Sequence, residues 1–187
     1  MTFPEIHELE TPRLRLRKLT REDILPYYQH IGSSEAVTRY MLFASHQDIS
    51  ESVASVEKAL IRYEEGRCYR WCIASREDNS LMGIIELLRF DEENQSCSFA
   101  YMLGESFWGK GYGTEAVNSA FRFAFEQMGV QSITADHMTD NPASGAVMRK
   151  AGMVFQEQIP KKYIKNGICY DATQYTITRE QWCLSHS

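Results

Sequence analysis

Three glycines alternate with other residues in a loop near the middle of the chain, and this loop constrains the fold more than any other segment. Residues 108–116 read Trp-Gly-Lys-Gly-Tyr-Gly-Thr-Glu-Ala. A strand pattern, Ser96–Leu103, precedes the loop, and a helical pattern over 112–128 follows at once. Glycines let backbone N–H groups surround an anion, and a helix start adds unpaired N–H donors and the positive end of its dipole. The segment therefore predicts a strand–loop–helix unit that binds a pyrophosphate without a metal ion.

Other phosphate-loop patterns fit this segment less well. Gly104, Gly109 and Lys110 match part of the P-loop of nucleotide triphosphatases, but Gly111 stands where a hydroxyl would hold magnesium. A dinucleotide fingerprint needs Gly-x-Gly-x-x-Gly and an acidic residue at the end of the next strand, whereas the glycines here are spaced Gly-x-Gly-x-Gly. Taken alone, the glycines are also compatible with a plain turn between a strand and a helix.

The remaining chain predicts an α+β fold, with a mixed α/β second half, in a single domain over residues 1–187. The expected strands are 14–19, Tyr69–Ser75, 81–90, Ser96–Leu103, 131–138, 153–159 and 170–177, and the expected helices are 20–32, 50–66, 112–128 and 142–151. Thr20 and Asp23 form a capping-box pattern, and Gly66 stands where a helix commonly stops. The helix over 50–66 carries Val53 and Val56 on its expected buried stripe.

Composition excludes several classes of function. The formal net charge is −5, which argues against a nucleic-acid partner. No apolar run reaches the roughly 18 residues that span a bilayer, and the start of the chain lacks a signal-peptide pattern, so we expect a cytoplasmic protein without a membrane partner. The five cysteines are odd in number and include no Cys-x-x-Cys pair, which argues against a disulfide framework and against a metal site.

A second motif narrows the interpretation. Asn141-Pro142 places a strong N-cap and an N1 proline directly after a predicted strand, with Ser144 at N3. Together with the loop, this motif makes the sequence resemble the GNAT superfamily of N-acetyltransferases. Residues 108–116 resemble the family's acetyl-CoA signature, (Arg/Gln)-x-x-Gly-x-(Gly/Ala), with Trp108 in place of the first polar residue. Residues 141–153 and 10–17, with Asp23, are similar to motifs of the branch that acetylates ribosomal-protein N-termini, and the likeness runs from about residue 10 to residue 177.

The resemblance implies a mostly antiparallel twisted sheet, flanked by helices and splayed at the acetyl-CoA site. Ser96–Leu103 would be the strand that carries a bulge and splays from its neighbour. Its last backbone groups would pair with the pantetheine arm, and the loop N–H groups would hold the pyrophosphate. The implied donor-binding residues are Tyr101, Met102, Leu103, Trp108, Gly109, Lys110, Gly111, Tyr112, Gly113, Thr114, Asn141 and Ser144.

The implied reaction is direct transfer of an acetyl group from acetyl-CoA to a primary amine within a ternary complex. The acceptor would be a protein N-terminus or a small molecule, and a homodimer is one possible assembly. An amine must lose a proton and the thiolate must gain one, which calls for a base and an acid. The family's usual glutamate and tyrosine are replaced by Ser98 and Met148.

Substitutes for this acid–base pair are Ser144 as the acid and Glu86 or His137 as the base, with Asp136 a weaker candidate. Each has a purely structural alternative: a helix-cap serine, a solvated strand face and a strand-end histidine, respectively. A second hypothesis is therefore a non-catalytic CoA-binding sensor that keeps the cradle and has lost the acid and base.

Overall fold

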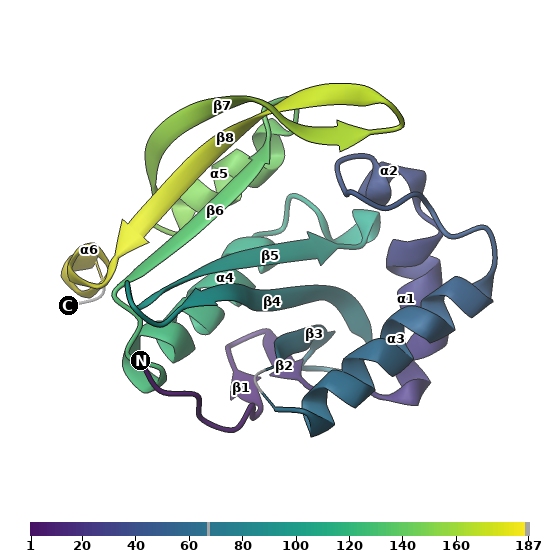
Figure 1. Ribbon diagram of the computed structural model, residues 1–187. Helices are drawn as coiled ribbons and strands as arrows, with labels where there is room; N and C mark the ends of the chain where they lie inside the picture. Colours follow the sequence, from purple (N-terminus) through teal and green to yellow (C-terminus); the bar gives the residue numbers. More distant parts are fainter. Residues whose placement is uncertain (67, 186–187) are drawn as a thin grey trace.

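The computed structural model describes residues 1–66 and 68–185, in which eight strands form one twisted sheet (Figure 1). The strand order is β1-β2-β3-β4-β5-β6-β8-β7, and every neighbouring pair is antiparallel except β5 and β6. The strands are β1 Leu9–Glu10, β2 Leu14–Arg17, β3 Tyr69–Ser75, β4 Leu81–Asp91, β5 Ser96–Leu103, β6 Ser132–Met138, β7 Val154–Lys165 and β8 Ile168–Thr178. The expected mixed α/β, mostly antiparallel architecture is confirmed.

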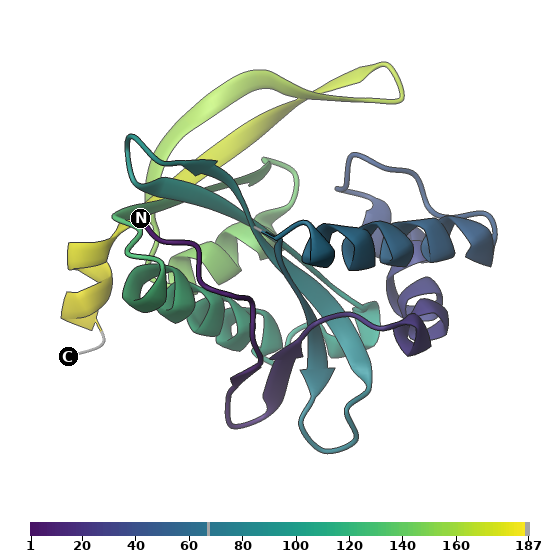
Figure 2. The same ribbon diagram turned by 60° about the horizontal axis from the view of Figure 1, so that its bottom comes forward.

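Helices cover both faces of this sheet. They are η1 Arg21–Asp23, α1 Ile24–Tyr27, η2 Tyr28–Gly32, α2 Glu35–Thr38, α3 Ile49–Glu64, η3 Glu105–Phe107, α4 Tyr112–Arg122, η4 Phe123–Gln127, α5 Pro142–Lys150 and α6 Arg179–Ser185. Successive side chains of a strand point to opposite faces. Accordingly, Trp71 and Ile73 of β3 pack into the cluster that contains α4, whereas Cys72 and Ala74 pack into the cluster that contains α1 and α3. Figure 2 shows α3 and α4 on opposite sides of the strands.

The helical layer before β3 follows the sequence patterns at its ends and departs from them in between. Both hydrogen bonds of the Thr20–Asp23 capping box are present, and Gly66 has a φ of 75°, as a C′ residue requires. The helix expected over 20–32 is divided into 3₁₀, α and π turns. Val53 is 36% exposed, so its expected place in the buried stripe of α3 is wrong; Ser52, Val56 and Ala59 face the core instead.

The C-terminal half ends in a hairpin that is longer than its sequence pattern indicates. β7 and β8 extend six and two residues beyond the expected strand ends at 159 and before the expected start at 170, and the turn at Asn166-Gly167 has positive φ angles of 51° and 76°. β8 inserts between β6 and β7, which leaves β7 at the edge of the sheet. The short elements β1, α2 and α6 have no counterpart among the expected ones.

The sheet opens between β5 and β6. These strands pair only from Ser96–Ser98 to Ser132–Thr134 and then diverge, although both continue for several residues (Figure 1). The expected splay is thus confirmed, whereas the bulge expected in β5 lies in its neighbour β4, where Arg89 has a φ of 52°. Within residues 1–66 and 68–185, no helix combines the length and apolar character that a bilayer crossing needs.

Candidate active site

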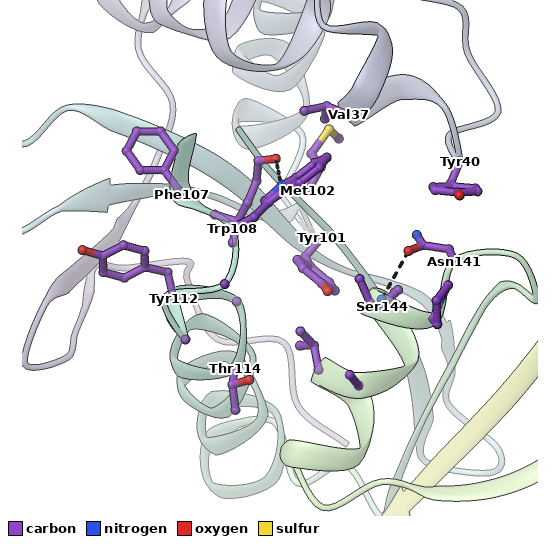
Figure 3. Close-up of a pocket in the computed structure, with 18 of the residues that line it drawn as sticks. Val37, Tyr40, Tyr101, Met102, Phe107, Trp108, Tyr112, Thr114, Asn141 and Ser144 are labelled. Atoms are coloured by element: carbon purple, nitrogen blue, oxygen red, sulfur yellow. Dashed lines mark hydrogen bonds between the residues drawn. The ribbon is translucent and has the colours of Figure 1, made fainter. Parts of the chain in front are cut away.

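A cavity of about 430 Å³ lies where β5 ends and where α4 and α5 begin (Figure 3). Eleven of the twelve residues expected to bind the acetyl donor line this cavity, and Lys110 is the exception. Its walls are Ala36, Val37, Tyr40, Met41, Tyr101, Met102, Leu103, Phe107, Trp108, Gly109, Gly111, Tyr112, Gly113, Thr114, Asn141, Pro142, Ala143, Ser144, Ala146, Val147 and Lys150. The tertiary structure therefore brings the loop and the Asn141 motif to one space.

The glycine loop forms one end of the cavity with a backbone that favours glycine. Gly109 and Gly111 have φ angles of 72° and 83°, in the left-handed region that residues with a Cβ rarely adopt. Gly111 is the N-cap of α4, and no side chain caps this helix. The N–H groups of the first turn, including those of Gly113 and Thr114, are therefore available to an anion at the positive end of the helix dipole. Lys110 turns its Nζ to the carbonyl oxygen of Ser106, at 2.9 Å.

Trp108 and Gly113 explain how this loop is held against the end of β5. The indole Nε1 of Trp108 donates to the carbonyl oxygen of Leu103 at 2.8 Å, while its ring remains 47% exposed beside the cavity. A Cβ on Gly113 would lie 3.3 Å from Cε2 of Tyr101 and 3.4 Å from Cδ1 of Leu103. Glycine at position 113 therefore lets the first turn of α4 approach the strand closely.

Tyr101, Asn141 and Ser144 meet in the middle of the cavity (Figure 3). The Asn141 side chain accepts a hydrogen bond from the Ser144 backbone N–H at 3.3 Å, which confirms Asn141 as the N-cap of α5. Burial raises the pKa of Tyr101 to about 12, against the opposing effect of its side-chain hydrogen bond with Ser144. Two neutral hydroxyl groups therefore face the space between β5 and α5. Met148 is buried in the core on the α4 side and does not line the cavity.

The two candidate bases lie outside the cavity wall. Glu86 accepts a hydrogen bond from Nη1 of Arg62 on α3 at 2.9 Å, on the face opposite α4. His137 is 8% exposed, and its Nδ1 donates to the Met138 carbonyl oxygen at 2.7 Å. Its Nε2 faces Gly145 of α5 and has no hydrogen-bond partner within the described part of the chain. Either base would therefore reach the reacting amine only through water or through a rearrangement.

Asp136 lies just beyond the last paired residue of β6. Its carboxylate is held by the ammonium of Lys162 and the hydroxyl of Tyr163, both from β7. This contact ties the long hairpin to the diverging strand. Among the described residues, no three metal-ligating side chains gather at a common point.

Sequence reasoning missed the wall that α2 supplies. Val37, Tyr40 and Met41 come from a segment whose only helix has four residues, too short for a hydrophobic period to be recognised. Tyr40 faces Asn141 across the cavity (Figure 3). Lys165, near the tip of the β7–β8 hairpin, donates to the carbonyl oxygens of Thr38 and Arg39 at 2.7 and 3.1 Å. The hairpin thus supports α2 over a distance of more than 120 residues in the sequence.

A splayed sheet with an anion loop beside the opening defines the class of acyltransferases that use coenzyme A. The acetyltransferase (GNAT) domain family matches residues 13–154, about three quarters of the chain, and the chain belongs to this family. It is an acetyl-CoA-dependent N-acetyltransferase, which transfers an acetyl group to an amine.

Similar proteins agree with this assignment. The uncharacterized N-acetyltransferase YoaA of Bacillus subtilis is 27% identical over 171 residues, which cover 91% of this chain and 96% of YoaA. The uncharacterized N-acetyltransferase p20 of Bacillus licheniformis is 30% identical over 136 residues, with 73% and 76% covered. The crystal structure of a GNAT-family acetyltransferase from Bacillus anthracis superposes with a TM-score of 0.83 at 21% identity, covering 92% of this chain and 99% of that one, which shows the shared fold.

Proposed function

We propose that this enzyme acetylates the α-amine of a protein N-terminus, or a small molecule with an amine of similar pKa, by direct transfer in a ternary complex. The observation that carries the proposal is the cavity, which joins the glycine loop to the opening between β5 and β6. Acetyl-CoA would bind with its pyrophosphate on the loop and its pantetheine arm along Tyr101–Leu103. A backbone N–H of that strand would stabilise the oxyanion that develops on the acetyl group.

The walls of the cavity favour an acceptor that loses its proton easily. Among the described residues, none that lines the cavity is an aspartate, glutamate or histidine. The pKa of an α-amine is about 8 and that of a lysine side chain about 10.4, so near pH 8 about half of the former and under about 1% of the latter are neutral. An α-amine therefore depends less on a strong base close by. The likeness of residues 10–17 and 141–153 to the ribosomal-protein branch points to the same acceptor class.

We further propose that Ser144 supplies the proton to the leaving thiolate, because its side chain faces the middle of the cavity at the start of α5. Glu86 and His137 remain the proposed bases, each acting through water. Ser144→Ala should lower kcat by about 10²-fold while changing the Kd of acetyl-CoA little. An unchanged kcat would remove Ser144 as the acid, and pH–rate profiles of Glu86→Ala and His137→Ala would identify the base by loss of the acidic limb.

Donor binding can be tested with two matched glycine substitutions. Gly109 lines the cavity with a φ of 72°, and Gly129, after α4, has a φ of 71°; a Cβ at either position meets no atom within 4 Å. Both aspartate variants therefore carry similar backbone strain, but only Gly109→Asp adds a negative charge to the anion cradle. Calorimetry should show acetyl-CoA binding weakened about tenfold or more in Gly109→Asp and unchanged in Gly129→Asp. Equal affinities in the two variants would show that the pyrophosphate binds elsewhere.

A non-catalytic CoA sensor is the second candidate, favoured by Ser98 and by the buried Met148. Free-thiol release from acetyl-CoA, measured with N-terminal peptides, polyamines and amino-acid derivatives, separates the two. Turnover with any acceptor supports the enzyme, whereas tight acetyl-CoA binding without turnover supports the sensor. We also propose that residues 1–187 act as one acetyltransferase domain and that the protein is cytoplasmic, where its thiols stay reduced.

A further inference from the structure

Glu115 places a negative charge in the first turn of the helix that the anion loop enters. It directly follows Thr114, which lines the cavity. A carboxylate at a helix N-terminus is favourable for the helix itself, but it repels a second anion at the same site. The donor site therefore contains a residue whose charge opposes the binding of pyrophosphate unless another group compensates for it.

Arg13 compensates this charge. Its Nε donates to one carboxylate oxygen of Glu115 at 2.7 Å, and its Nη2 lies 2.6 Å from the same oxygen. The other oxygen accepts hydrogen bonds from the Arg13 backbone N–H at 3.0 Å and from the Thr11 hydroxyl at 2.7 Å. Burial acts to raise the pKa of Glu115, but the bonds from Thr11 and Arg13 outweigh it and lower that pKa. Glu115 is therefore a paired carboxylate.

The same guanidinium group also contacts the loop. Its Nη1 donates to the carbonyl oxygen of Lys110 at 3.0 Å, and its Cζ lies 4.5 Å from the ring centroid of Tyr112. A Cβ on Gly111 would stand 3.4 Å from Nη2, in ordinary contact. All three guanidinium nitrogens are therefore used, two on Glu115 and one on the loop backbone. Arg13 supports the cradle from the side and has no nitrogen left over for the ligand.

We propose that Arg13 is a positioning residue of the donor site, which neutralises Glu115 and holds residues 110–112 in the conformation that receives a pyrophosphate. This inference rests on the proposed donor site. It gives a role to the Thr11–Arg13 part of the N-terminal motif, which lies about a hundred residues from the loop in sequence and beside it in the fold. Its ligand class is the diphosphate of a CoA thioester.

The test is a double-mutant cycle on the affinity for coenzyme A, with Arg13→Gln, Glu115→Gln and the double variant. Arg13→Gln should weaken binding about tenfold, because the carboxylate then faces the diphosphate unpaired. Removing the carboxylate as well should recover most of that loss, so that the double variant binds more tightly than Arg13→Gln alone. Arg15→Gln is the control, since Arg15 pairs with Glu8 and Glu10 at the surface and should leave the affinity unchanged.

A purely structural role for Arg13 gives a different pattern. The double variant would then bind no better than Arg13→Gln, and that result would overturn the proposal. The loss in Arg13→Gln should also shrink at high salt, because screening weakens the repulsion, whereas a distorted loop would not recover. If Arg13→Gln fails to fold, the comparison of Glu115→Gln with the double variant decides: equal affinities support the compensating charge, and a tenfold weaker double variant refutes it. Absence of coenzyme A binding to the unmodified protein would instead refute the proposed function.

Discussion

The ion pair between Arg17 and Asp23 offers the largest effect on stability that the structure predicts for a single side chain. Two parallel hydrogen bonds of 2.8 Å join the guanidinium to the carboxylate, and the side chains are only 14% and 4% exposed. Asp23 also accepts the backbone N–H of Thr20 at 2.8 Å, which closes the capping box of η1. Asp23→Ala would remove the pair and the cap together, at the start of the helical layer that carries α2.

The magnitude follows from what Arg17 retains. Breaking a buried ion pair from one side costs about 3–5 kcal/mol, and loss of an N-cap about 0.5–2 kcal/mol. In the variant, Arg17 keeps its hydrogen bonds to the Lys18 carbonyl oxygen and to two oxygens of Asn79, so the charge is not isolated. We therefore expect a total near the lower end, about 3 kcal/mol. For a chain of this length that lowers Tm by roughly 6–12 °C.

Urea unfolding followed by circular dichroism measures this difference, and a second pair provides a matched control. Arg21 and Glu57 also form two hydrogen bonds, at 2.6 and 3.1 Å, but the Arg21 side chain is 74% exposed. Exposed pairs contribute little, so Glu57→Ala should leave the unfolding midpoint unchanged. A loss below about 1 kcal/mol in Asp23→Ala, or equal losses in the two variants, would refute the argument that burial decides the value of the pair.

Three further results are expected. Gly145→Ala would place a Cβ 2.6 Å from Nε2 of the buried His137, so it should lower the free energy of unfolding by about 1–3 kcal/mol; a melting curve like that of the unmodified protein would contradict this, and adding His137→Ala should relieve the overlap. A thiol reagent should titrate two cysteines in the folded protein and five in urea, and labelling of more than two before unfolding would contradict the burial. The buried ones are Cys68, Cys72 and Cys97, and the exposed ones are Cys169 and Cys183. Burial raises the pKa of Cys72 and Cys97 from 9.0 to about 12, so between those values the unfolded chain loses thiol protons that the folded chain keeps, and stability falls as pH rises. Urea midpoints at about pH 8 and about pH 10.5 check this, and a midpoint that stays constant would count against it.

Local sequence signals predicted the parts of the fold that depend on neighbouring residues. The Thr20–Asp23 cap, the stop at Gly66, the turn at Asn166-Gly167 and the Asn141 cap are all present, because each is decided by hydrogen bonds or φ angles within a few residues. The glycine loop belongs to the same group. Its positive φ angles at Gly109 and Gly111 reflect a backbone requirement that the residue types themselves reveal.

The pairing of distant segments, in contrast, had no local signal. Glu86 and His137 look alike in sequence as polar residues on strands, yet one is paired with Arg62 across the sheet and the other is buried under α5. Which face a strand residue takes depends on register, and a shift of one position exchanges the two faces. For the same reason, α2 could not be assigned to the cavity before Lys165 and the hairpin were seen to support it.

The sequence by itself therefore determined the chemical nature of the donor site, because an anion cradle is built from consecutive backbone groups whose conformation glycine makes possible. Only the tertiary structure decided which side chains surround the acceptor and what balances the charge of Glu115. Those contacts join residues up to about 130 positions apart, and they form only when the sheet closes its register and buries both of its faces.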